Sequence, residues 1–177
     1  GTVTYDGTGS YTGLKAGNNY YNLTFDGSGG TWTLNSALDT NNNLTISAGT
    51  LAANNNTINI GKNWSNSGAF TAGTGTVTFD GTSQQISGNT TFNNFTKSVA
   101  AADTLTFAAN TTQTISNTLT LQGAAGNLLS LRSGTDGTQW SINSLAGEPG
   151  GKPVLGYPCS EARRLLLIEY DNPPYGR

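Results

Sequence analysis

Three aspartates share one local pattern, with an aromatic residue before the Asp and a glycine after it: Asp6, Asp26 and Asp80. Stacked in a column, their carboxylates would bind Ca²⁺ or supply a general acid and base. In the alternative, each Asp side chain accepts a hydrogen bond from a nearby backbone N–H in a turn, while the glycine adopts positive φ. The segments DGTGS and DGSGG lack the strict nonapeptide period of calcium-binding β-rolls. We therefore predict structural turns and no metal site.

The rest of the chain offers few partners for catalysis. It has no histidine, which removes the commonest general base and a common metal ligand. Its one cysteine excludes a disulfide framework and a multi-cysteine zinc site. Enzymatic cleavage of polysaccharides needs clustered carboxylates with basic partners, whereas the basic residues before position 143 are widely separated: Lys15, Lys62, Lys97 and Arg132. We predict no enzymatic activity and no cofactor.

Aromatic side chains offer a different chemistry, the stacking of a ring on a sugar. Trp32 and Trp140 occupy apolar positions of an alternating pattern, so we expect them in the core. Tyr20 and Tyr21 are adjacent and must point to opposite faces if this stretch is a strand. Trp64 lies in the segment KNWSNSG, which we expect to be a loop. The candidate glycan-binding residues are therefore Trp64, Tyr20 and Tyr21, with Trp64 the best single candidate.

Threonines recur in Thr-X-Thr pairs, at Thr2, Thr4, Thr31, Thr33, Thr76, Thr78, Thr104, Thr106, Thr118 and Thr120. On a flat sheet such pairs would form an outward ladder, which is one route to ice binding because it orders surface water. The alternative is that threonine has high β-propensity and is tolerated on a solvent-facing strand. The irregular spacing between the pairs favours this alternative.

The elements that must position these residues are short strands. An apolar–polar–apolar triplet recurs along the chain, and alternation of this kind places two apolar side chains on one face of a strand. The triplets before residue 100 are Val3-Thr4-Tyr5, Leu23-Thr24-Phe25, Trp32-Thr33-Leu34, Leu44-Thr45-Ile46, Ile58-Asn59-Ile60 and Val77-Thr78-Phe79. Asn, Gly, Ser and Asp clusters separate them, as turns do. Helical periodicity is absent from residues 1–143.

Short strands with polar turns predict an all-β chain, and we favour a right-handed parallel β-helix, or β-solenoid. At roughly 20 residues per coil, residues 1–143 would form about seven coils. The alternative is a β-sandwich with hairpin connections. The spacings from Phe25 to Ile46 and from Ile60 to Phe79 are about one coil long and exceed a hairpin loop, so they favour the solenoid.

An internal repeat spans most of the chain. GTVTYDG at 1–7 recurs as GTVTFDG at 75–81, and YYNLT at 20–24 recurs as FNNFT at 92–96. GTWTL at 30–34 is followed by DTLTF at 103–107, and NLTI at 43–46 by TLTL at 118–121. Four blocks in the same order predict two repeat units, at about 1–74 and 75–143.

These blocks carry a resemblance to a known family. GTVTFDG, then QQISGNTTFNNFTKS, further triplets and LLSLRSGTDGTQWSIN resemble the repeats of large bacterial cell-surface β-helix proteins of the filamentous-haemagglutinin-like, adhesin-like kind. The resemblance covers residues 1–143. It implies an elongated, non-catalytic stalk or an adhesive surface, located outside the cell.

Residues 144–177 differ in composition from everything before them. All five prolines, the only cysteine and all three glutamates lie after Asn143. The segment 160–170 could form a short helix or an apolar strand. We leave two alternatives open: the tail caps the open end of the solenoid, or it is foreign to the repeat protein.

Charge sets the expected partners. The net charge is −2, so the chain has no electrostatic footprint for nucleic acid, and no apolar run reaches transmembrane length.

We expect a structural or adhesive segment of a secreted or surface-attached bacterial protein. Its expected partners are cell-surface glycans or further repeats of the same protein. The alternative is a β-solenoid module that binds glycans or ice.

Overall fold

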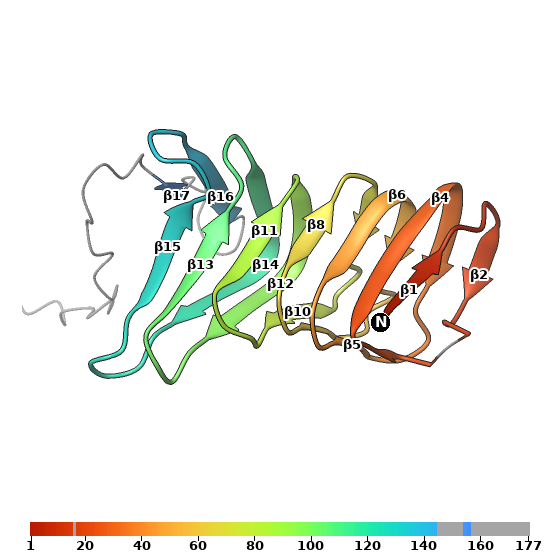
Figure 1. Cartoon of the computed structure of the whole chain (residues 1–177), viewed down its shortest axis with the longest axis horizontal. Coiled ribbons are helices and arrows are strands. Elements are labelled where there is room, and N and C mark those ends of the chain that lie inside the picture. The colour runs from red at the N-terminus through yellow and green to blue at the C-terminus, as the bar shows by residue number, and fades with distance from the viewer. Residues whose placement is uncertain (16, 145–153, 157–177) are drawn as a thin grey trace, which may run out of the picture.

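The computed structural model describes residues 1–15, 17–144 and 154–156 (Figure 1). This part of the chain contains strands and no helix, and the strands stack along the long axis of the molecule. The strands are β1 (Thr2–Tyr5), β2 (Ser10–Thr12), β3 (Asn19–Tyr20), β4 (Asn22–Thr33), β5 (Leu38–Thr40), β6 (Leu44–Ala52), β7 (Ile58–Ile60), β8 (Trp64–Asn66), β9 (Ala69–Thr71), β10 (Thr76–Phe79), β11 (Gln84–Ser87), β12 (Thr90–Ser98), β13 (Asp103–Phe107), β14 (Thr112–Gln122), β15 (Leu129–Ser133), β16 (Trp140–Ser144) and β17 (Val154–Gly156).

The strands form two sheets, and successive strands of each sheet come from successive coils. One sheet has nine strands and runs β1-β4-β6-β8-β11-β13-β15, with β2 beside β4 and β9 beside β6. The other has eight and runs β17-β16-β14-β12-β10-β7-β5-β3. Every pairing between these strands is parallel, apart from β16 with β17. A sandwich with hairpin connections would be antiparallel, so the β-solenoid prediction is confirmed.

The nine-stranded sheet contains two rows of strands, because β4 and β6 are long enough to pair twice. Their first halves pair with β1 and β8, which we call the first row, and their second halves pair with β2 and β9, which we call the second row. The register shifts in β4 between Phe25 and Thr31, where one row passes into the next.

The length of a coil follows from the register. Leu44 pairs with Trp64, twenty residues later, as predicted. Near the C-terminal end the coils lengthen, since Leu105 pairs with Leu131 and Thr112 pairs with Ser141. The path from β1 to β15 contains six parallel steps, so the chain makes about six turns. The prediction of about seven was too high because it assumed a constant coil length.

The core is a narrow column of inward side chains. Leu23, Leu44, Trp64, Ile86 and Phe107 lie in register on successive coils, and each is completely buried. Each such side chain contributes about 1.5–3 kcal/mol by leaving water. Aromatic rings also stack from coil to coil, as in the in-register pair of Tyr5 and Phe25, whose centroids lie 5.8 Å apart. The triplets therefore alternate as the sequence predicts.

The sequence repeat does not coincide with the coils. GTVTYDG contains β1 of the nine-stranded sheet, whereas GTVTFDG contains β10 of the eight-stranded sheet. The same change of sheet separates NLTI in β6 from TLTL in β14. An offset of 74 residues is not a whole number of coils of about 20 residues. An alternating triplet suits either sheet, so the repeated blocks can occupy different sides of the solenoid.

Of the tail, the structure describes Ser144 and Val154–Gly156. Ile142 pairs with Val154 and Trp140 with Gly156, so β17 runs antiparallel beside the last strand of the eight-stranded sheet. This pairing covers a strand edge that would otherwise be open. The candidate segment 160–170 lies outside the described residues.

Candidate functional site

Trp64 is completely buried, so the prediction that it lies in a surface loop is wrong. It begins β8 and points inward between Leu44 and Ile86 of the adjacent coils. Its indole N–H donates to Thr90 Oγ1 at 3.1 Å. The Asn- and Ser-rich flanks suggested a loop. In the structure Ser65 is the outward position of a strand, whereas Asn66 is buried and its Nδ2 donates to Thr90 Oγ1 at 3.2 Å. Trp32 and Trp140 are buried, as predicted.

The two adjacent tyrosines point to opposite faces, as predicted. Tyr21 is 58% exposed, whereas Tyr20 is buried and cannot offer its ring to a glycan. The Tyr20 hydroxyl donates to the carbonyl of Gly17 at 2.7 Å and lies 2.9 Å from the hydroxyl of Tyr5. Burial, followed by the hydrogen bond and the charge interaction with Tyr5, raises the pKa of Tyr20 above its usual range. Tyr20 is thus a core residue, and its place among the glycan candidates was wrong.

The structure does not bring the three aspartates together in one cluster. Asp6 and Asp80 follow β1 and β10, whereas Asp26 lies inside β4 at the register shift. Among the described residues no group of three or more potential metal-ligating side chains occurs.

The glycines that follow these aspartates have a different role from the one predicted. None of Gly7, Gly27 and Gly81 has positive φ. A Cβ on Gly27 would collide with the carbonyl oxygen of Gly7, and one on Gly81 with that of Gly61. Glycine is needed there because the backbone of the neighbouring coil approaches closely.

The Thr-X-Thr pairs do not form one ladder. Thr2, Thr4, Thr104 and Thr106 lie in the first row, but four strands separate β1 from β13. Thr31 and Thr33 lie in the second row, and the other four (Thr76, Thr78, Thr118 and Thr120) lie in the eight-stranded sheet. Short columns of threonine do form across adjacent coils, but they combine members of these pairs with threonines outside them, as in Thr78, Thr96 and Thr120.

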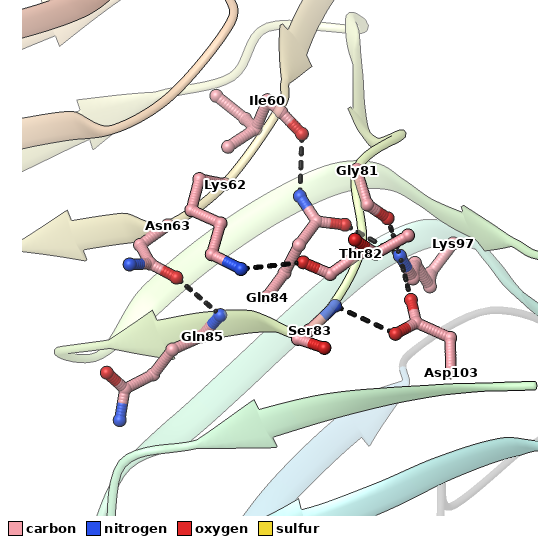
Figure 2. Close-up of polar contacts among 10 residues, drawn as sticks. All are labelled: Ile60, Lys62, Asn63, Gly81, Thr82, Ser83, Gln84, Gln85, Lys97 and Asp103. Atoms are coloured by element: carbon pink, nitrogen blue, oxygen red, sulfur yellow. Dashed lines mark hydrogen bonds and ion pairs between the residues drawn. The ribbon is translucent and has the colours of Figure 1, made fainter.

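A polar cluster that the sequence analysis missed lies inside the solenoid, where the chain turns from β10 into β11 (Figure 2). Its members are Gln84 at the start of β11, Lys97 near the end of β12 and Asp103 at the start of β13. Gln84 and Lys97 are completely buried, and the side chain of Asp103 is 5% exposed. We call this set the buried amine cluster.

The Lys97 ammonium donates two hydrogen bonds and forms one ion pair. Nζ lies 2.5 Å from the carbonyl oxygen of Gly81, 2.7 Å from Gln84 Oε1 and 2.8 Å from Asp103 Oδ2. The carboxamide of Gln84 is fixed at its other end, where Nε2 donates to the carbonyl of Ile60 at 2.6 Å. The cluster therefore holds its groups in one orientation.

The second carboxylate oxygen of Asp103 is also occupied. The backbone N–H of Ser83 donates to Oδ1 at 2.8 Å, and Ser83 has a positive φ of 49°. Burial by itself raises the pKa of Asp103, but hydrogen bonds from Lys97 and from the Ser83 and Thr104 backbone amides, with the attraction of the ammonium, outweigh it and lower the pKa. Asp103 is thus a carboxylate beside a buried ammonium.

One signal in the sequence could have revealed this cluster. Phe95-Thr96-Lys97 and Gln84-Gln85-Ile86 are triplets in which one apolar position is polar. An inward lysine needs a buried acceptor or an anion, so a search for its partner would have followed. The partner Asp103 begins another triplet-bearing strand, and no local spacing points to it.

Outside the core, an asparagine column follows the first row. Asn22 Oδ1 accepts from the backbone N–H of Asn43 at 3.2 Å, and Asn43 Oδ1 accepts from that of Asn63 at 3.3 Å. Asn63 Oδ1 accepts from the backbone N–H of Gln85 at 2.9 Å. These asparagines connect one coil to the next, which is a structural use.

Comparisons with protein-family models, curated proteins and solved structures find no match for this chain. No helix able to span a membrane is present in the part of the chain that the structure describes. The chemistry available must therefore be inferred from the geometry alone. That geometry places a buried amine in contact with a carboxamide and with a carboxylate.

Proposed function

We propose that this chain is a non-catalytic structural segment of a secreted, surface-attached bacterial protein. The observation that carries the proposal is the uninterrupted parallel stack, in which each coil covers the apolar interior of the next. A stack of this kind gives an extended body whose length grows with the number of coils. The resemblance of residues 1–143 to the repeats of cell-surface proteins supports the same role.

The six steps from β1 to β15 set the length that such a spacer contributes. At a strand spacing of about 4.8 Å, six steps correspond to about 30 Å. Spin labels at Thr2→Cys and Arg132→Cys, with Cys159→Ser, would measure this span by pulsed electron resonance. The expected distance is about 30 Å plus the reach of the labels, and it should persist when the chain is held under load.

A glycan-binding role is the second candidate, and one groove favours it. A groove of about 420 Å³ lies at the N-terminal end and is lined in part by Tyr11, Asp6, Ser10 and Lys15. Tyr11 is 38% exposed, and its ring stacks on buried Trp32. An aromatic platform with polar neighbours suits a sugar ring.

A glycan microarray separates the two roles. The structural proposal predicts that the wild-type chain and the Tyr11→Ala and Tyr21→Ala variants give equal, background signals. Binding that Tyr11→Ala or Tyr21→Ala abolishes would support the adhesive role in place of the purely structural one. Release of products from an immobilised glycan would contradict the non-catalytic proposal. A parallel assay for thermal hysteresis, expected to be negative, tests the ice-binding alternative.

A further inference from the structure

The buried amine cluster contains an ammonium, a carboxamide and a carboxylate, which packing of the interior does not require. A lysine ammonium could be replaced here by an apolar side chain of similar length, as in other coils. Instead Lys97 Nζ contacts Gln84 Oε1 at 2.7 Å and Asp103 Oδ2 at 2.8 Å (Figure 2). The amine, a possible nucleophile, thus contacts both an acyl group and a base, and each of the three is held by a different strand.

We propose that Lys97 and Gln84 form an intramolecular amide bond, with Asp103 as the catalytic acid and base. The carboxylate of Asp103 takes a proton from Nζ, and the neutral amine attacks Cδ of Gln84. The bond from Cδ to Nε2 then breaks, and ammonia leaves after Nε2 has received the second proton of the attacking nitrogen. The ammonia takes the proton held by Asp103 and departs as ammonium. The products are the amide, one ammonium ion and the original carboxylate, with no oxidant or reductant.

The positions of the amine and the carboxamide bring the reacting atoms together before the reaction begins. The contact of Nζ with Oε1 places Cδ of the same carboxamide beside the amine, and a pre-formed contact of this kind replaces a bimolecular encounter. The Ile60 carbonyl holds the Gln84 amide nitrogen at 2.6 Å, so the carboxamide cannot rotate its oxygen away from Lys97. Ile60 and Gly81 are positioning residues in this scheme.

The interior also keeps competing water away from the amine and the carboxamide. Gln84 and Lys97 are completely buried, which excludes the water that would compete as a nucleophile. The hydrogen bonds that lower the pKa of Asp103 also make it a weaker base, so the neutral amine is a minor species and we expect the reaction to be slow. Asp103 keeps its carboxylate form through the Ser83 backbone amide, and this form is the one that accepts the proton.

The consequence is a covalent staple across the solenoid. Gln84 belongs to the nine-stranded sheet and Lys97 to the eight-stranded sheet, so the amide would connect the two sheets through the interior. It closes a short segment of chain, as a disulfide does, in a protein whose described residues contain no cysteine. The cross-link does not depend on the structural role proposed above.

Intact-mass spectrometry of the denatured full chain tests the proposal. The wild-type protein, kept folded before the measurement, should weigh less than its sequence by one molecule of ammonia. Asp103→Asn is the matched control, since it keeps the shape of the side chain and removes the base, and it should retain the full mass. Chymotryptic cleavage at Phe92 should leave the peptides with Gln84 and Lys97 joined in one species.

Three outcomes would contradict the proposal in whole or in part. A wild-type chain that keeps its full sequence mass after prolonged incubation in the folded state has no amide. A loss of ammonia that maps to any other peptide, such as a cyclised asparagine, is not this cross-link. If Asp103→Asn also forms the link, the role of Asp103 is wrong. The wild-type measurement stands even where a variant fails to fold.

Discussion

Two regions of the same solenoid meet the demand for a filled interior in opposite ways. The column of Leu23, Leu44 and Trp64 is entirely apolar and close-packed. The buried amine cluster, one coil further on, fills the same kind of space with a carboxamide, an ammonium and a carboxylate. The backbone ladder is parallel in both regions. The coil therefore specifies where side chains point, and its interior accepts polar groups where every donor has an acceptor.

The difference matters for energetics. In the apolar column, stability comes from area removed from water and from close packing. In the cluster, the desolvation of two charges is offset by their attraction and by fixed hydrogen bonds. In the apolar column, truncation of a side chain should lower the free energy of unfolding in proportion to the volume removed. In the cluster, loss of one charged partner should lower it sharply, because the other charge is left buried and unpaired.

The largest expected effect follows from breaking the ion pair. In a Gln84→Leu background, which cannot form the amide, Lys97→Met should lower the free energy of unfolding by about 3–5 kcal/mol because it leaves a buried carboxylate unpaired. Adding Asp103→Leu should recover most of the loss, since the charge is then gone. Urea unfolding monitored by tryptophan fluorescence measures both changes. Equal stability of the three proteins would show that the pair is not buried in solution.

The apolar column should lose almost as much from a single truncation. Leu44→Ala leaves a cavity between Leu23 and Trp64 and should reduce the free energy of unfolding by about 2–5 kcal/mol. Thr45→Ala, on the outer side of the same strand, is the matched control and should change it by less than about 0.5 kcal/mol. Similar losses in both variants, measured by urea unfolding, would contradict the assigned facing of β6.

We expect a smaller loss of stability from substitution of a glycine at which two coils approach closely. Gly27→Ala should destabilise the protein by about 1–3 kcal/mol, because the new Cβ meets the carbonyl oxygen of Gly7. Gly1→Ala is the control, since nothing lies within 4 Å of the Cβ position there. Thermal melting of the two variants compares them directly. A melting temperature unchanged by Gly27→Ala would mean that these coils are further apart.

The smallest effect is a pH dependence confined to the cluster. Because the folded state lowers the pKa of Asp103 below its ordinary 3.8, the carboxylate adds stability above that pH and loses it as the pH falls through the lower, folded pKa. The stability difference between Gln84→Leu and Gln84→Leu/Asp103→Asn should therefore be constant near neutral pH and shrink in acid. Unfolding curves across this range measure it. A difference that grows in acid has the wrong sign for this account.

The sequence was sufficient for the architecture because the architecture is local and repeated. Triplets such as Leu44-Thr45-Ile46 indicate which side chains of a strand face the core. Their spacing of one coil favours stacked coils over hairpins. It was insufficient for Trp64, because the Asn and Ser residues beside it have the composition of a loop. It was also insufficient for Asp103, whose contact with Lys97 depends on how two coils come together. The glycan candidate Tyr21 alone kept its expected exposure.

The most direct test of the central claim, a stack of parallel coils with a polar cluster inside, is the pattern of nuclear Overhauser contacts in an isotope-labelled sample. The account predicts contacts between the side chains of Leu44, Trp64 and Ile86, about one coil apart in sequence, and between the Lys97 side chain and Gln84. Close Hα–Hα contacts between strands that follow one another in the sequence, which antiparallel hairpins produce, would contradict it.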